Sequence, residues 1–348
     1  MIKNRETWMD TAKGIGILAV VMGHSDNLIA QHYLFWFHMP LFFAMSGYFY
    51  KPLENKKDFY PWCVKRGKQL LIPYFLFASV LTLFNLLLLS PDLSIKHILI
   101  EFAKIPYGGQ ALDGILSPFW FITCLFLTQI LFALIDLKFK TNKTKAIIIG
   151  LLYLAAHLIA YLITYVKTEH SINLMVPWSA DISLMTLTYY AIGFYLKSYF
   201  NAILKSKLVI GAIILLSLLF VGLDHFKVIA YDLDLKDQQY TNVLLDALIP
   251  FSLMIMVLLL SKVISASLPG RFFAHLGAAS LPIMYLHIFF NTLMNQYISY
   301  NYLFFTLIGV AFPYAVTKLI LEKFHMTNSL FLGNFKSKGK TPDNQIAA

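Results

Sequence analysis

Long apolar runs alternate with short polar segments along the whole chain, and this pattern is typical of a polytopic membrane protein. A membrane-spanning helix needs about 20 mostly apolar residues. Ten runs approach that length: Gly14–Ala30, Tyr33–Tyr50, Leu70–Leu89, Ser117–Leu137, Ala146–Val166, Ile182–Lys197, Leu208–Leu223, Val243–Ile264, Phe272–Tyr297 and Tyr300–Ile320. The pattern predicts an all-α membrane protein with about ten transmembrane helices. Residues 1–323 would form the membrane domain, and residues 324–348 a short disordered tail.

Composition supports this fold class. The 348 residues are 58% hydrophobic and only 13% charged, whereas a soluble globular protein carries roughly 25% charged residues. A soluble enzyme and a disordered protein are therefore excluded. The chain has two cysteines, Cys63 and Cys124, which excludes a disulfide framework and a cysteine metal site.

The positive charges predict the orientation of the chain. If the N-terminus lies in the cytoplasm, 23 of the 28 Lys and Arg residues fall in cytoplasmic segments. The five in outer loops are Lys96, Lys104, Lys167, Lys227 and Lys236. This asymmetry follows the positive-inside rule, so we expect both termini in the cytoplasm. The net charge of +10 then reflects loops that face anionic lipid, and no nucleic-acid partner is expected.

The first apolar run is accompanied by three ionisable residues, Asp10, Lys13 and His24. On a helix, Lys13 and His24 differ by only about 20° in direction and lie about 16 Å apart along the axis. Asp10 shares their face and can pair with Lys13 at spacing i,i+3. Ionisable groups inside a membrane are costly and mark functional sites. The alternative is a Lys13 that reaches the inner interface and a His24 that is merely hydrogen-bonded.

Two further histidines are predicted at a depth similar to that of His24. A turn near Gln31–His32 is expected to separate the first two spans. His24 lies seven residues before Gln31, and His38 lies seven residues after it. His287 lies about ten residues from the outer end of the ninth span. His157, in the fifth span, has no polar neighbour in the sequence and is interpreted as a structural histidine.

Three histidines at one depth favour general-base catalysis, in which an imidazole takes a proton from a hydroxyl. A metal site is the weaker interpretation and no metal is expected, because no Asp or Glu lies firmly within the three spans that carry these histidines to complete the ligand set. One catalytic and two packing histidines is a third interpretation.

A basic cluster directly precedes the third span. Lys65, Arg66 and Lys68 stand in the segment V-K-R-G-K-Q-L-L-I-P-Y. Such residues anchor a helix at the cytoplasmic interface, and they also suit a phosphate-bearing ligand such as coenzyme A. Spacing alone leaves both interpretations open.

Taken in order, these motifs resemble the acyltransferase-3 family of integral membrane O-acyltransferases, most closely its fucose 4-O-acetylase-like branch. The resemblance extends from about Arg5 to Ile320. The spacing of Lys13 and His24 is similar to the family's signature of a basic residue ten positions before a histidine. Five further segments match in order: F-H-M-P-L-F-F-A-M-S-G-Y with His38, the basic cluster, P-F-W-F-I-T-C-L-F, A-I-G-F-Y-L-K, and S-L-P-I-M-Y-L-H with His287. Many members carry Arg at the position of Lys13, and relatives usually carry a second Arg at that of Gln69.

The resemblance implies transfer of an acetyl group from cytoplasmic acetyl-CoA to a sugar hydroxyl of a cell-surface polysaccharide or its lipid-linked precursor, at the bacterial inner membrane. His24 would be the general base or a transient acetyl carrier. His38 and His287 would assist it, and Asp10 would accompany Lys13. Arg66, Lys68 and Lys13 would bind acetyl-CoA.

The rival hypothesis is a proton-coupled transporter or lipid-linked glycan flippase that uses the histidines as a proton relay. The lack of an internal sequence repeat argues against it.

Overall fold

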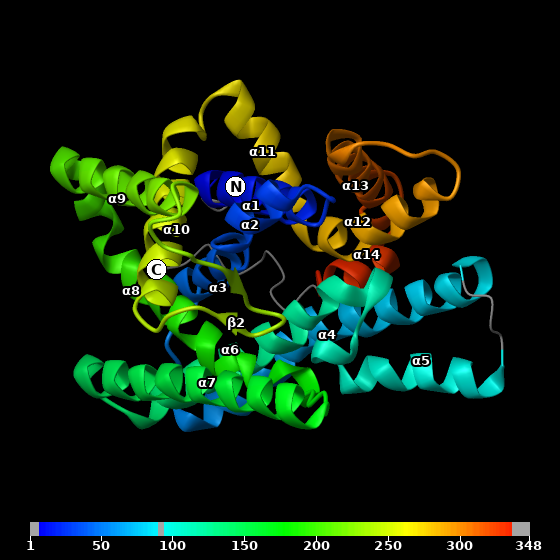
Figure 1. Ribbon diagram of the computed structural model, residues 1–348, viewed down its shortest axis with the longest axis horizontal. Coiled ribbons are helices and arrows are strands. Elements are labelled where there is room, and N and C mark those ends of the chain that lie inside the picture. The colour runs from blue at the N-terminus through cyan, green and yellow to red at the C-terminus, as the bar shows by residue number, and fades with distance from the viewer. Residues whose placement is uncertain (1–6, 90–93, 336–348) are drawn as a thin grey trace, which may run out of the picture.

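The computed structural model describes residues 7–89 and 94–335, and these fold almost entirely into helices (Figure 1). In chain order the α-helices are α1 (Thr7–Gly23), α2 (Leu28–Phe35), α3 (His38–Tyr48), α4 (Phe59–Phe84), α5 (Ile95–Tyr107), α6 (Trp120–Lys138), α7 (Asn142–His170), α8 (Ile182–Lys205), α9 (Lys207–His225), α10 (Leu245–Ile264), α11 (Leu268–Ala278), α12 (Ser280–Asn295), α13 (Tyr302–Val316) and α14 (His325–Leu332). The strands β1 (Leu233–Asp234) and β2 (Gln239–Tyr240) form a small antiparallel hairpin between α9 and α10. The predicted all-α fold class is confirmed.

Short irregular helices connect or extend these elements. They are the 3-10 helices η1 (Lys56–Asp58), η3 (Gly109–Ala111), η4 (Gly114–Phe119) and η5 (Pro177–Ser179), and the π-helices η2 (Asn85–Leu89) and η6 (Thr317–Leu321). The helix η4 leads directly into α6 and, as described below, forms one wall of the main cavity.

Among the described residues, six helices are long and apolar enough to cross a membrane. They are Lys56–Leu88, Gly114–Lys138, Asn142–His170, Lys207–His225, Leu245–Ile264 and Tyr302–Leu321. The pair α11 and α12 adds a seventh when counted as one span, although the two helices meet at 78°. The protein is therefore a polytopic membrane protein by length and composition, and the predicted number of ten spans stays a prediction.

Several predicted elements differ from those observed. The first run forms α1, which begins at Thr7 instead of Gly14 and has 17 residues. The turn predicted near Gln31–His32 was wrong, because both residues lie inside α2 and the chain turns at residues 24–27. The second run is interrupted at Trp36 and Phe37, where α2 gives way to α3. Part of the segment expected as an outer loop forms α5, whose first turn is capped by the Ser94 side chain. Within the predicted tail, α14 packs on α4, and Gly333 lies against the backbone of Gln69. The rest of that predicted tail, residues 336–348, lies outside the described residues.

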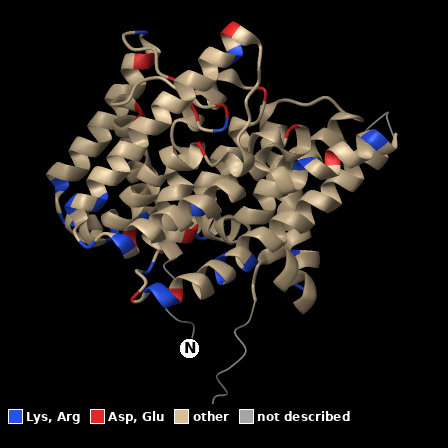
Figure 2. Cartoon of the chain, turned by 90° about the horizontal axis from the view of Figure 1, so that it is seen from below, with Lys and Arg blue, Asp and Glu red and all other residues tan. Residues whose placement is uncertain are grey.

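Basic and acidic residues gather on opposite sides of the molecule. Figure 2 shows most Lys and Arg along the edge where α1 begins, and many Asp and Glu toward the opposite edge. This arrangement agrees with the charge asymmetry of the sequence. We call the first edge the basic side and the second the acidic side.

The helix α1 is enclosed by its neighbours, because glycines let other backbones approach it closely. A Cβ on Gly14 would lie 1.9 Å from the carbonyl oxygen of Phe273 in α11, and one on Gly277 would lie 1.9 Å from that of Asp10. Thr11 also donates a hydrogen bond of 3.1 Å to the Gly270 carbonyl. Small residues at helix crossings are the usual means of close packing in membranes. They fix α1 at the centre of the bundle.

A second close crossing joins α3 to α8. A Cβ on Gly193 would lie 1.8 Å from the carbonyl oxygen of Ala44, and one on Gly47 would lie 1.9 Å from that of Tyr190. The two helices therefore touch backbone to backbone. Since α3 begins at His38, this crossing helps to fix the position of that histidine.

We expect the substitution Gly193→Ala to destabilise the protein by about 1–3 kcal/mol, because the added methyl meets backbone that must shift. The measurement is the Tm of the detergent-extracted protein. Gly211→Ala in α9 is the matched control, since a Cβ there meets nothing within 4 Å. Equal Tm values for the two variants would contradict the close α3–α8 contact.

Candidate functional site

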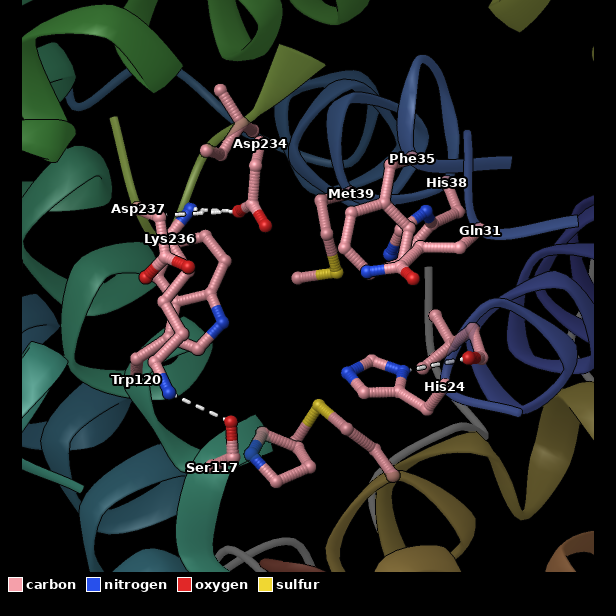
Figure 3. Close-up of a pocket in the computed structure, with 14 residues that line it drawn as sticks. His24, Gln31, Phe35, His38, Met39, Ser117, Trp120, Asp234, Lys236 and Asp237 are labelled. Carbon is pink, nitrogen blue, oxygen red and sulfur yellow. Dashed lines mark hydrogen bonds between the residues drawn. The ribbon is translucent and has the colours of Figure 1, made fainter. Parts of the chain in front are cut away.

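A cavity of about 200 Å³ opens between the end of α1, the helices α2 and α3, the turn η4 and the hairpin β1–β2 (Figure 3). His24 and His38 lie on one side of it. Ser117 and Trp120 lie opposite, with the hairpin residues Asp234, Lys236 and Asp237 nearby. The cavity thus brings together residues from distant parts of the sequence.

The three predicted histidines share one hydrogen-bonding pattern. The Nδ1 atom of His24 lies 2.8 Å from the Val20 carbonyl, that of His38 lies 2.7 Å from Leu34, and that of His287 lies 2.8 Å from Met284. A carbonyl oxygen only accepts hydrogen bonds, so each Nδ1 carries the proton and donates. In the neutral ring, each Nε2 then keeps a lone pair. This is the tautomer that a general base requires.

The structure also brings these three rings together. The rings of His24 and His287 pack edge to face with 5.1 Å between their centroids. The Phe35 ring lies 5.6 Å from that of His24 and 4.8 Å from that of His38. His287 is fully buried, and its Nε2 has no hydrogen-bond partner among the described residues. A buried acceptor without a donor is costly, so this atom is suited to receive a proton or a ligand hydroxyl.

The break between α2 and α3 places His38. The chain leaves α2 after Phe35, and His38 is the first residue of α3. Its ring bonds back across the break to the carbonyl of Leu34. The sequence pattern predicted one continuous span here, because apolar residues continue through the break.

Asp10 and Lys13 lie apart from this cavity. They form an ion pair of 3.4 Å near the start of α1, and the Lys13 ammonium lies 5.4 Å from the centre of the Phe49 ring. Three helical turns separate Lys13 from His24, or about 16 Å. The structure therefore places Asp10 and Lys13 on the basic side. Of the three ionisable residues predicted for the first span, only His24 reaches the cavity.

Arg66 and Lys68 lie in the first half of α4. The Arg66 guanidinium lies 5.9 Å from the Trp62 ring and donates a hydrogen bond of 3.2 Å to Gln69. Lys68 and Lys65 line a second cavity, of about 510 Å³, together with Tyr60 and Phe335. We call this the basic cavity. Its lysines and aromatic rings suit a ligand that carries phosphate and a planar base.

Sequence reasoning missed the contribution of the hairpin. Lys236 was counted only as an outer-loop charge, yet its ammonium donates to the Ser117 hydroxyl at 2.6 Å and to the Leu112 carbonyl at 3.0 Å. These bonds hold the hairpin over the cavity. Burial lowers the pKa of Lys236. The available signal was the charge-rich segment D-L-D-L-K-D at residues 232–237.

His157 has a polar partner, contrary to expectation. Its Nε2 lies 3.0 Å from a carboxylate oxygen of Asp246, and its Nδ1 lies 2.9 Å from the Tyr153 carbonyl. Asp246 is fully buried within α10, a helix that carries none of the three candidate histidines. The pair joins α7 to α10 away from the cavity.

A metal was considered for the three histidines. Within residues 7–89 and 94–335, no group of three His, Cys, Asp or Glu side chains is placed to hold a metal ion. The described site therefore offers imidazole, carboxylate and ammonium groups for acid–base chemistry.

These features define a membrane protein with a histidine-lined cavity, and comparison with known sequences identifies its class. The chain belongs to the acyltransferase family whose model, described as "Acyltransferase domain", matches residues 6–321. It is therefore a polytopic membrane protein of this family.

Two curated relatives carry the name Nodulation protein NolL. That of Mesorhizobium japonicum is 28% identical over 140 residues, which cover 37% of this chain and 35% of the relative. That of Sinorhizobium fredii is 30% identical over 162 residues, which cover 43% of each chain. The chain thus spans less than half the length of either relative. No solved structure matches the chain.

We expect Asp234 to make stability depend on pH. Burial, and then the charge of Asp237, raise the pKa of Asp234 to about 6. A raised carboxyl pKa means that the folded protein binds the proton more tightly than the unfolded chain. The stability that this proton contributes is therefore lost as pH rises toward and through 6. A shift of about two units corresponds to about 3 kcal/mol.

The measurement is the Tm difference between Asp234→Asn and wild type at pH 4.5 and pH 7.5. The Tm of the variant should increase relative to that of wild type as pH rises. The asparagine amide oxygen can still accept the hydrogen bonds that Asp234 Oδ1 accepts from the backbone N–H groups of Lys236 and Asp237. Parallel Tm curves would show that Asp234 titrates normally.

Proposed function

We propose that this acyltransferase is an O-acetyltransferase of the bacterial inner membrane, close to the fucose 4-O-acetylase-like branch. It moves an acetyl group from cytoplasmic acetyl-CoA to a sugar hydroxyl of a cell-surface polysaccharide or its lipid-linked precursor. In this proposal the chain has ten spans and both termini lie in the cytoplasm. The histidine-lined cavity on the acidic side is the site of transfer.

The observation that carries the proposal is the tautomer shared by His24 and His38, which line one cavity, and by His287, whose ring packs on that of His24. His24 is the general base, because it lines the cavity and is partly exposed there. Its Nε2 takes the proton of the sugar hydroxyl while that oxygen bonds to the thioester carbonyl carbon. The carbon–sulfur bond then breaks, and the departing thiolate takes the proton from His24. An acetyl ester and free coenzyme A result.

His38 and His287 assist this proton transfer. The ring of His287 packs on that of His24 and limits its rotation. His38 lines the same cavity and accepts a hydrogen bond from the sugar through Nε2. A thioester is an activated donor, so orientation and one proton transfer are sufficient. Orientation supplies about 7–11 kcal/mol and general-base catalysis about 10²–10⁴-fold in rate.

The donor binds on the basic side. Arg66 and Lys68 contact its phosphates, supported by the lysine and aromatic lining of the basic cavity. Lys13, held by Asp10, provides a further positive charge on the way to the transfer site. The pantetheine arm then follows α1 toward His24, over the roughly 16 Å that separates the two residues.

We expect His24→Ala to lower the rate of acetyl transfer about 10²–10⁴-fold while the protein still folds, because the general base is lost. The measurement is acetylation of surface glycan, alongside the amount and Tm of extracted protein. His170→Ala is the control, since His170 lies exposed at the far end of α7. His157→Ala is a poor control because it would break the bond to Asp246.

Activity of a folded His24→Ala protein within about threefold of wild type would contradict the catalytic role. Inverted vesicles distinguish the rival hypothesis. Given acetyl-CoA and acceptor glycan, an acetyltransferase releases free coenzyme A, whereas a flippase moves glycan without that release.

The donor site predicts a different kinetic effect. We expect the double variant Arg66→Ala, Lys68→Ala to raise KM for acetyl-CoA about tenfold with a smaller change in kcat, because it removes charge-assisted bonds to phosphate. Steady-state release of coenzyme A measures both constants. Lys57→Ala is the control, since Lys57 is exposed just before α4. Equal effects of the control and double variants would place the donor elsewhere.

A further inference from the structure

A third cavity, distinct from the basic cavity, adjoins the histidine-lined one on the acidic side. It has about 310 Å³ and is lined by Gln31, His32, Asp232, Asp234, Asp237 and Gln239, with Leu28 and Phe35. Four of these residues, Gln31, Phe35, Asp234 and Asp237, also line the histidine cavity. The two cavities are therefore contiguous. We call this third cavity the vestibule.

The hairpin aims acceptor oxygens into the shared region. One oxygen of Asp234 receives hydrogen bonds from the backbone N–H groups of Lys236 at 2.8 Å and Asp237 at 3.2 Å, which orient the carboxylate (Figure 3). The other Asp234 oxygen and both oxygens of Asp237 have no hydrogen-bond partner among the described side chains and backbone. Carboxylate and amide oxygens of this kind accept hydrogen bonds from hydroxyl or ammonium groups.

The deep end of the shared cavity carries an independent sign of a polar ligand. His38 is only 2% exposed, and its Nε2 has no hydrogen-bond partner within the described part of the chain. Its ring lines the cavity. The unused lone pair of this nitrogen can accept a hydrogen bond from a hydroxyl group. A ligand hydroxyl that enters through the vestibule would supply that donor.

The charge of the vestibule limits which ligands enter. Three carboxylates line it, from Asp232, Asp234 and Asp237. The ammonium of Lys236 bonds only to the neutral groups of Ser117 and Leu112 and keeps its charge, while His32 lies 2.8 Å from Asp224 and 3.9 Å from Asp232. The three carboxylates outnumber this one ammonium. The region is therefore negative, and like charges across a binding surface are strongly disfavoured.

We propose that the vestibule and the β1–β2 hairpin form the acceptor subsite, and that it takes a sugar unit that is uncharged or carries an amine. A unit bearing a carboxylate or phosphate is excluded by Asp234 and Asp237. This inference rests on the proposed acetyl transfer to sugars and adds the class of acceptor. Asp237 is the specificity-determining residue, because it lines both cavities and makes no side-chain bond needed for folding.

The experiment uses the full-length protein in detergent with three probes, the methyl glycosides of glucose, glucosamine and glucuronic acid. Acetyl transfer from acetyl-CoA gives kcat and KM for each, and the Tm shift that each glycoside causes reports binding without chemistry. We expect wild type to prefer glucosamine and glucose over glucuronic acid. Asp237→Asn should lower kcat/KM for the glucosamine glycoside about fivefold, the size of one partly exposed charge contact. The KM for acetyl-CoA should not change.

Asp237→Lys should reverse the preference in favour of the glucuronic acid glycoside. Raised salt should weaken the charge preference of wild type and that of this variant. Glu169→Gln is the matched control, because it removes an exposed carboxylate near the end of α7 that lines neither cavity. Equal use of all three glycosides, or a preference unaltered in both Asp237 variants, would overturn the acceptor subsite while leaving the acetyltransferase intact. Binding with the expected charge preference but without acetyl transfer would support the subsite and refute the proposed reaction. If no glycoside binds or is acetylated, the vestibule is not a sugar site.

Discussion

The structure depends on enclosing α1, a helix that carries Asp10 and Lys13 and ends at His24. Charged and polar side chains are costly in contact with lipid, so this helix is stable in a membrane only when other helices surround it. Glycines make the enclosure tight, as at Gly14 against α11 and Gly277 against α1. Close backbone contact excludes lipid from the polar face.

The same enclosure gives the histidines their chemistry. Inside a helical bundle the nearest available acceptors are backbone carbonyls of the preceding turn, and His24, His38 and His287 each donate from Nδ1 to one. The backbone thereby selects the tautomer, and Nε2 is left for a ligand. The same hydrogen bond within the helix thus leaves the Nε2 atom of all three rings without an intrahelical partner, and packing decides which of the rings reach the cavity. His24 and His38 line it, whereas His287 lies behind His24.

The chain belongs to an acyltransferase family. In the proposed reaction, the division of charge between its two sides would keep donor and acceptor apart. A phosphate-bearing donor suits the lysines of the basic cavity, whereas the carboxylates of the hairpin suit hydroxyl and amine groups. Opposite electrostatic fields at the two ends would direct each substrate to its own entrance. In that proposal, transfer requires only that the reacting groups meet beside His24.

The sequence by itself determined the all-α membrane class, the acyltransferase resemblance and the three histidines that the structure brings together, because apolar length and helical spacing are local properties. It did not determine the break at Trp36 and Phe37, since apolar residues continue through it. The sequence also did not determine the His157–Asp246 bond or the position of Lys236 over the cavity. These contacts join residues separated by 89 positions in one case and by 119 in the other. Only tertiary packing decides which distant polar groups meet, because in a membrane interior each buried polar group must find a partner from whichever helix lies beside it.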